Sequence, residues 1–147
     1  MSVWQQLGDL LQRWRTRFGA ACTRWFPPLT LGQLGERAAA RFLRKQGYII
    51  IACGHRDHFG EIDIIAVDGR TVVFVEVKTR SSQDAGHPGE AVDHDKQRRL
   101  TRAASAYRKR HDLTENAARF DIVAITWPQG KGKPQIEHIK NAFEATE

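Results

Sequence analysis

The sequence predicts one α/β domain in which a mixed β-sheet is flanked by helices. Apolar residues recur with helical spacing in two segments of this domain, and β-branched residues gather in five shorter segments. These segments follow one another in the order α-β-β-β-α-β-β, which is typical of a sheet covered by helices. The length of 147 residues suffices for one such domain with one core, and hardly for two.

The elements of the domain can be assigned in order along the chain. A helix is predicted over residues 31–46, where the apolar residues form one face and Gly47 follows as a C-cap signal. A hairpin is predicted around Asp68-Gly69. The elements after the first helix are a strand at residues 48–52, a polar loop at 54–60, strands at 61–67 and 71–79, a loop at 80–89, a helix at 91–111, a strand at 120–127 and a short strand at 136–139.

An N-terminal extension precedes this domain. Residues 3–18 show an amphipathic helical pattern, and Pro27-Pro28 stops any helix. We therefore divide the chain into an amphipathic extension with a hinge, residues 1–30, and the domain itself, residues 31–147. Such a helix can make a peripheral contact with a membrane surface or bind a partner, although docking on its own domain or partial disorder is more common.

The composition is that of an ordinary globular domain, with 41% apolar and 27% charged residues. No apolar run approaches the roughly 20 residues that a transmembrane helix needs. Asp9 and Arg13 interrupt any signal-peptide core, so a cytoplasmic location is expected. Cys22 and Cys53 are isolated, which predicts neither a zinc site nor a disulfide framework.

The net charge of +6 is unevenly distributed. Residues 96–111 contain seven basic residues and no acidic one, whereas residues 1–31 contribute +3 and the remaining residues −4. This basic stripe consists of Lys96, Arg98, Arg99, Arg102, Arg108, Lys109 and Arg110. Without an acidic residue among them, these side chains forgo the usual i,i+4 pairing. The stripe therefore favours a polyanion held near a cation site over a merely solvated helix face.

The predicted hairpin carries the candidate catalytic residues. Side chains alternate between the faces of a strand, so Glu76 and Lys78 share one face. A two-residue loop at Asp68-Gly69 sets Asp63 opposite Phe74 and diagonal to Glu76, and a four-residue loop sets it directly opposite Glu76. In both registers Asp63, Glu76 and Lys78 lie on the same face, whereas an odd loop would separate them.

Carboxylates that face each other across a hairpin repel, so a cation, a proton or a lysine must compensate. The arrangement suits Mg²⁺ (or Mn²⁺), since Mg²⁺ takes one or two carboxylates and retains several waters. Lys78 can then orient an attacking water or stabilise the charge of a phosphorane-like transition state. These features outline a site of phosphodiester hydrolysis, and an ordinary surface ion pair between Glu76 and Lys78 is the alternative.

Two further polar features have simpler interpretations. His55-x-x-His58 falls in a predicted loop and is interpreted as a solvated pair. Asp121 lies in an apolar strand, which indicates a structural hydrogen-bonding residue more than a functional one.

The hairpin also carries a resemblance to known proteins. Asp63 followed by Glu76-Val77-Lys78, in this order of helices and strands, resembles the PD-(D/E)xK nuclease superfamily, whose fold is restriction endonuclease-like. A closer resemblance links the chain to the uncharacterised bacterial YraN-type family over about residues 31–147. The motifs that carry it are GEIDIIA at residues 60–66, VFVEVKTR at 73–80, RFDIVA at 119–124 and IKNAF at 139–143.

The resemblance implies roles for individual residues, with archaeal Holliday-junction resolvases as the nearest well-understood analogues. It implies that Asp63 and Glu76 hold the metal and that Lys78 is the lysine of the motif. Ile62 stands where the motif has proline. The remaining implied positions are Glu36 as an additional catalytic carboxylate of the first helix, Arg56 as an arginine ahead of the aspartate, and Lys96 as a phosphate-binding lysine at the head of the second helix.

Three function hypotheses follow from the sequence. The first is a Mg²⁺-dependent, structure-selective DNA endonuclease, similar to a Holliday-junction resolvase and dimeric if it acts on junctions. The second is a non-catalytic nucleic-acid-binding module of the same fold. The third is an interaction or membrane-peripheral factor that acts through the N-terminal helix. In the first two, Lys96, Arg98, Arg99, Arg102 and Arg56 are the expected nucleic-acid contacts.

Overall fold

The computed structural model describes residues 28–81, 92–128 and 132–146. The elements are α2 (Leu31–Lys45), β1 (Ile49–Asp57), β2 (Gly60–Asp68), β3 (Thr71–Ser81), α3 (His94–Arg110), β4 (Ala118–Trp127) and β5 (Gln135–Phe143). The predicted order of elements is confirmed. The amphipathic helix expected at residues 3–18 lies outside the described residues. In the part of the chain that is described, no helix has the length and apolar character needed to cross a membrane.

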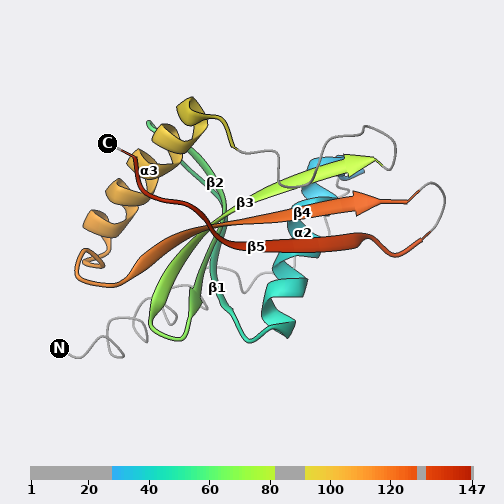
Figure 1. Cartoon of the computed structure of the whole chain (residues 1–147), viewed down its shortest axis with the longest axis horizontal. Coiled ribbons are helices and arrows are strands. Elements are labelled where there is room, and N and C mark those ends of the chain that lie inside the picture. The colour runs from blue at the N-terminus through green and yellow to red at the C-terminus, as the bar shows by residue number, and fades with distance from the viewer. Residues whose placement is uncertain (1–27, 82–91, 129–131, 147) are drawn as a thin grey trace.

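The five strands form one mixed sheet in the order β1-β2-β3-β4-β5. Strands β3 and β4 are parallel, and the other neighbouring pairs are antiparallel. A parallel pair needs a long connection, and here that connection contains α3. Helices α2 and α3 cover opposite faces of the sheet (Figure 1).

The alternation of β3 separates the apolar core into two layers. Val72 and Phe74 pack toward α3, whereas Val73 and Val75 pack toward α2. The layer under α3 also contains Ile62, Ile65, Leu100, Ala103, Tyr107, Phe120 and Ile122. The layer under α2 also contains Ala39, Leu43, Tyr48, Ile64, Val123 and Ile125. Both faces of the central strands are therefore buried, which explains why β3 and β4 read as nearly continuous apolar runs.

Helix α2 is defined at both ends by local chemistry and in the middle by close packing. Thr30 and Gln33 form a reciprocal capping box at its start. After its end Gly47 adopts a φ of +91°, a conformation that glycine tolerates best. Gly35 lies so close to β3 that a Cβ at this position would stand 1.8 Å from Thr79 Oγ1. This contact fixes where the first turns of α2 sit on the sheet.

The prediction of a polar loop at residues 54–60 is wrong, because β1 continues through this segment to Asp57. The turn contains only His58 and Phe59, and Asp57 Oδ1 accepts hydrogen bonds from the amides of Phe59 (2.8 Å) and Gly60 (3.2 Å). The polar residues of β1 lie on an edge strand, where exposed positions do not prevent pairing. His55 is correspondingly part of a strand, and its ring packs edge-on against Tyr107 at 5.0 Å.

The predicted hairpin between β2 and β3 is confirmed, and its register is now defined. Asp68 pairs with Thr71 across a two-residue turn, Gly69-Arg70, and Ile64 pairs with Val75. Continued by one residue, this register sets Asp63 directly opposite Glu76. Of the two predicted registers, the one with the carboxylates face to face is therefore correct. It arises from a two-residue turn shifted by one residue from Asp68-Gly69, and not from the four-residue loop with which it was predicted.

Candidate functional site

Asp63 lies where the regular pairing of β2 and β3 ends. The last paired residues on this side are Ile64 and Val75. Beyond them, Asp63 Oδ2 accepts a hydrogen bond of 2.7 Å from the backbone amide of Val77. The carboxylate thus takes the place of a backbone acceptor and is held against β3.

Glu76 is the second carboxylate of the site and is only 5% exposed. It lies two residues beyond Phe74 on β3, so both side chains are on the side of the sheet that faces α3. Its Oε1 forms an ion pair with the Nζ of Lys96. A carboxylate at this depth requires a compensating cation, and α3 supplies one.

The N-terminus of α3 brings two cationic side chains to the carboxylates. Asp93 is the N-cap and accepts a hydrogen bond of 2.8 Å from the amide of Lys96, which fixes the first turn of the helix. A cavity of about 270 Å³ lies between this turn and the strands. Its walls are formed by Gly60, Glu61, Asp63, Glu76, Lys96, Arg99 and Leu100.

Glu36 approaches the carboxylates from α2. The close contact of the preceding Gly35 with Thr79 sets its position relative to β3. Burial raises the pKa of Glu36 above its ordinary value, and the negative charges of Glu61 and Glu76 act in the same direction against Arg56. Glu36 therefore belongs to the electrostatic environment of the site, although it lines a neighbouring groove along α2.

The acidic cluster alters the protonation of Asp63. Its pKa is raised from 3.8 to about 7, first because the carboxyl group is buried and second because Glu76 is close. The amide of Val77 and the ammonium of Lys96 oppose this shift. The protonation of a group with such a pKa changes strongly when a cation binds nearby at neutral pH, because a cation favours the charged form.

The two lysines that the sequence associated with this site lie on different elements, Lys78 on β3 and Lys96 on α3. Lys78 lies two residues beyond Glu76 on β3 and is half-buried, and it is not one of the residues that line the cavity. Lys96, which was expected only at a phosphate, contacts Glu76 itself. This direct contact between helix and strand was not predicted.

The donor set fits a divalent cation with few protein ligands. Asp63 and Glu76 offer hard oxygen atoms, and Glu76 already contacts the ammonium group of Lys96. Among the described residues, no group of three or more histidine, cysteine, aspartate or glutamate side chains is arranged to hold a metal. Mg²⁺ and Mn²⁺ are compatible with this set, because Mg²⁺ is commonly bound through one or two carboxylates and waters.

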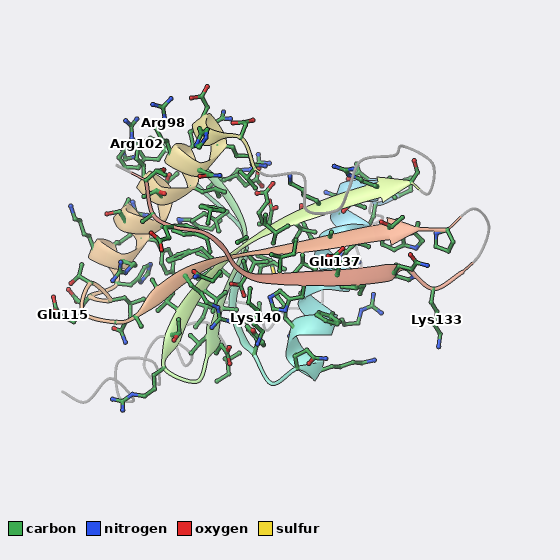
Figure 2. The ribbon with its side chains drawn as sticks, viewed as in Figure 1. Arg98, Arg102, Glu115, Lys133, Glu137 and Lys140 are labelled. Carbon is green, nitrogen blue, oxygen red and sulfur yellow. The ribbon has the colours of Figure 1, made fainter. Side chains whose placement is uncertain are left out.

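The residues of the predicted basic stripe make different kinds of contact. Arg98 and Arg102 extend from α3 away from the sheet (Figure 2). Arg98 also forms an ion pair with Asp95, an acidic residue immediately before the stripe. The prediction that the residues of the stripe have no acidic partner is therefore wrong for Arg98. Arg108 instead donates hydrogen bonds to the carbonyl groups of Leu113, Thr114 and Asn116, and therefore closes the turn after α3.

Arg56, the remaining predicted contact, is an exposed residue of β1. Its Nη2 lies 2.9 Å from Glu61 Oε2, and its side chain is 75% exposed. The ion pair holds the guanidinium beside an acidic residue that lines the cavity. Arg56 is thus near the site and remains accessible from solvent.

A second row of arginines on α2 was not predicted as functional. Arg37, Arg41 and Arg44 are exposed and line a groove of about 440 Å³ beside Glu36 and Cys53. Their spacing of four and three residues places them on one face of the helix. The signal was present in the sequence, but only the apolar face of this helix was interpreted.

Asp121 is fully buried and forms the centre of a hydrogen-bonded network, which confirms its structural interpretation. Its Oδ1 accepts from Arg119 Nε and from the amide of Asn141, each at 3.0 Å. His138 Nε2 lies 2.9 Å from Oδ2. Arg119 extends the network to Tyr48 and Asp68. This network ties β4 to β5 and to the β2–β3 hairpin, away from the cavity of Asp63.

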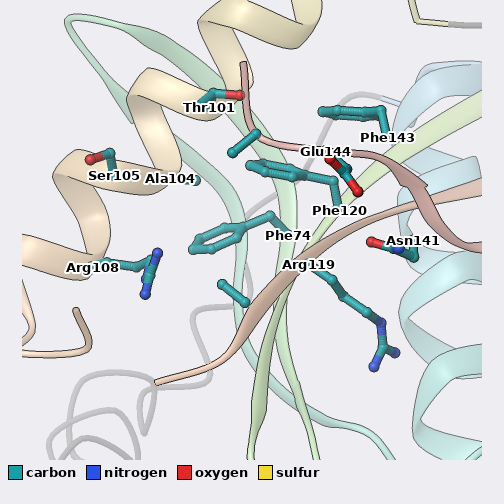
Figure 3. Close-up of a pocket in the computed structure, with 12 residues that line it drawn as sticks. Phe74, Thr101, Ala104, Ser105, Arg108, Arg119, Phe120, Asn141, Phe143 and Glu144 are labelled. Atoms are coloured by element: carbon teal, nitrogen blue, oxygen red, sulfur yellow. The ribbon is translucent and has the colours of Figure 1, made fainter. Parts of the chain in front are cut away.

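A further cavity of about 370 Å³ lies between α3 and the end of β5. Its floor is formed by the rings of Phe74, Phe120 and Phe143, and the last two stack at 4.8 Å (Figure 3). Arg119 points away from these rings, and Arg108 is engaged by carbonyl groups. This cavity offers apolar surface and no pair of carboxylates, whereas the smaller cavity is lined by both Asp63 and Glu76.

The order of elements and the carboxylate pair are consistent with the restriction endonuclease-like class of α/β domain. Residues 35–125 match the family model described as uncharacterised protein family UPF0102, and the chain belongs to this family. The predicted membership of the YraN-type family is thereby confirmed.

Relatives from distant bacteria share most of the chain. A UPF0102 protein from Symbiobacterium thermophilum is 50% identical over 78% of this chain and 97% of its own length. Similar proteins from Rhodopirellula baltica (48% identical; 78% of this chain, 71% of the relative) and Chlorobium phaeobacteroides (46%; 80% and 97%) carry the same family name. These names give the family and no activity.

Proposed function

We propose that this chain is a nucleic-acid-binding protein that hydrolyses phosphodiester bonds of DNA with the aid of Mg²⁺ or Mn²⁺. The observation that carries the proposal is the cavity in which Asp63 and Glu76 meet Lys96 and Arg99. Paired carboxylates suit a divalent cation, and the cationic wall suits a phosphate. Few other ligand classes require both at one place.

The proposal gives roles to four residues of the cavity and to Lys78 of β3. Asp63 and Glu76 would hold the cation, which when bound supplies electrophilic stabilisation to a phosphodiester under attack. Lys96 and Arg99 would draw the scissile phosphate toward the carboxylates. Lys78 would add positive charge from β3 and so stabilise the charge of the transition state.

The proposed substrate is flexed or branched duplex DNA. The motif resemblance is to enzymes of DNA junctions, and the described helices carry basic side chains suited to the phosphate backbone rather than a set aimed at base edges. Cleavage of both strands at a four-way junction requires two sites, so action on junctions would proceed through a homodimer. The place of action would be the cytoplasm.

A second candidate function is nucleic-acid binding without cleavage. It is favoured by the arrangement of the donors, since the described residues offer two facing carboxylates and no third ligand ready beside them. The ion pair between Lys96 and Glu76 would then be a structural feature. A third hypothesis, interaction through the N-terminal helix, concerns a segment that lies outside the described residues.

A cleavage screen separates the two candidates. The full-length chain is incubated with linear, forked and four-way DNA in the presence of Mg²⁺ or Mn²⁺, alongside Asp63→Asn and Glu76→Gln as matched isosteric controls. The proposal expects metal-dependent nicks on branched DNA that both variants lose while they retain DNA binding. Binding of branched DNA by the wild type without any nick in either metal would establish the non-catalytic function instead.

A further inference from the structure

The ion pair between Lys96 and Glu76 joins the two halves of the site in an unexpected way. Glu76 is 5% exposed, and its contact is the ammonium group of Lys96. The same ammonium acts electrostatically on Asp63. One lysine therefore compensates the charge of both carboxylates that are proposed to hold the metal.

Lys96 is suited to leave this position without disturbing the fold. Its side chain is 41% exposed, so a large part of it is in contact with solvent and is not enclosed by the core. Its backbone is fixed independently by the hydrogen bond of its amide to Asp93. Lysine carries its charge on a flexible four-carbon stem, so the ammonium can change partners while the helix stays in place.

Resting on the function proposed above, we propose that Lys96 is a placeholder cation that a divalent metal displaces from Glu76. The ammonium and the metal require the same oxygen atoms and repel each other, so they exclude one another. The displaced ammonium remains at the wall of the cavity beside Arg99, where a phosphate oxygen is its natural new partner.

This exchange couples the two ligands of the site. In the free protein the metal binds weakly, because it must break the ion pair of Lys96. A phosphate that engages Lys96 removes this opposition, and metal binding in turn frees Lys96 for a phosphate. Each ligand thus raises the affinity of the other by the same factor, as thermodynamic linkage requires.

Titration calorimetry with Mn²⁺ tests the displacement directly in the full-length chain. Replacement of Lys96 by Met, or by Gln if the first variant folds poorly, is expected to tighten Mn²⁺ binding by about tenfold. Arg99→Met is the matched control, because it removes a positive charge from the same cavity wall. It is expected to change the affinity by less than about threefold, since an exposed charge without direct contact is screened.

A second measurement tests the coupling. The affinity for a branched DNA is measured with and without Ca²⁺, an oxygen-seeking cation used here as a binding probe. The wild type is expected to gain about tenfold in DNA affinity from the cation, and the Lys96 variant to lose most of this gain. The difference between the two proteins isolates the contribution of Lys96.

The outcomes distinguish this inference from the proposed function. Equal Mn²⁺ affinities of wild type and Lys96 variant, or an equal tightening in Arg99→Met, would overturn the displacement even if cleavage is observed. Coupling that depends on Lys96 in a protein that never nicks DNA would support displacement and overturn hydrolysis. Failure of both wild type and variant to bind Mn²⁺ would overturn the displacement together with the metal site.

Discussion

Asp63 carries a carboxyl group that the fold holds largely out of water, and its pKa is raised from 3.8 to about 7. A buried acid with a raised pKa destabilises the folded state wherever it is ionised. The residue proposed to bind metal is therefore expected to reduce stability in the absence of metal.

Asp63→Asn is expected to be more stable than the wild type at about pH 8, by about 1 to 3 kcal/mol. Asn keeps an acceptor for the amide of Val77 and removes the buried charge. The advantage is fully present above pH 7 and shrinks as the pH falls toward 3.8, because the folded wild type takes up a proton in this range. Urea unfolding at several pH values measures it, and a wild type that is the more stable protein at pH 8 would contradict the expectation.

Asp121 illustrates the opposite balance for a buried carboxylate. Burial alone would raise its pKa, but the hydrogen bonds from His138, Arg119 and the amide of Asn141 outweigh burial and hold the pKa below its ordinary value. Its charged form therefore stabilises the fold.

Asp121→Asn is expected to lower the free energy of unfolding by about 3 kcal/mol, because Arg119 and His138 lose a buried anionic partner. Asp68→Asn is the matched control: it touches the same Arg119 from a side chain that is 36% exposed, and about 1 kcal/mol or less is expected. The stability from Asp121 is present above its ordinary pKa of 3.8 and is lost as the pH falls below it. Denaturant unfolding measures both variants. Equal losses in the free energy of unfolding would show that burial of the carboxylate does not determine its contribution to stability.

At the scale of elements, the position of α2 depends on one missing side chain. A Cβ at Gly35 would meet Thr79 Oγ1 at 1.8 Å and Thr79 Cβ at 2.9 Å, so α2 would have to move away from β3. Gly35→Ala is expected to cost about 1 to 3 kcal/mol and to displace Glu36 from the site.

Gly32→Ala in the same helix is the matched control for Gly35→Ala. Its new Cβ would find only Thr30 Oγ1, at 3.9 Å. The substitution is expected to stabilise the helix by about 0.5 to 1 kcal/mol. Thermal unfolding of both variants compares them, and a stabilised Gly35→Ala protein would refute the close packing.

The two helices each present a row of arginines, and salt dependence tells which row contacts nucleic acid. Each phosphate contact contributes about −0.9 to the slope of log affinity against log salt on duplex DNA. Replacing Arg98, Arg99 and Arg102 of α3 by Ala is expected to flatten the slope by roughly one to three units. The triple replacement of Arg37, Arg41 and Arg44 on α2 removes the same charge and serves as the comparison. A slope that changes only for the α2 triple would move the interface to that helix.

Local chemistry made most elements predictable, and edge strands were the exception. Gly47 and Asp68-Gly69 are local signals, and the helix and hairpin predicted from them lie near their observed ends. The capping box at Thr30 was a further local signal that the prediction did not use. Strand β1 was truncated in the prediction because residues 54–57 are polar. Strand β5 was predicted at residues 136–139 but extends from Gln135 to Phe143. Edge strands tolerate polar residues, so their length does not appear in the apolar pattern.

At the scale of the whole molecule, side-chain alternation predicted that Asp63 and Glu76 share one face of the hairpin, but it left two registers open. The register depends on which residues form the turn, and the turn is Gly69-Arg70 instead of the predicted Asp68-Gly69. The contact of Lys96 with Glu76 was not predictable, because it depends on how α3 docks on the sheet after the parallel pairing of β3 with β4. The spacing of the arginines of α2 was present in the sequence, but the groove that they line beside Glu36 was not.

The parallel pairing of β3 with β4 also has a consequence for the order in which the strands pair during folding. The pairs β1–β2, β2–β3 and β4–β5 join strands that are adjacent in the chain, whereas β3 and β4 are separated by the segment that contains α3. Closing that longer loop costs more entropy, so we expect the hairpins to form first and the crossover to limit the folding rate. Asp63 and Glu76 would then face each other before Lys96 arrives with α3. For that interval the nascent sheet holds two uncompensated charges, and a divalent cation in the refolding buffer would speed folding by taking the place that Lys96 fills later.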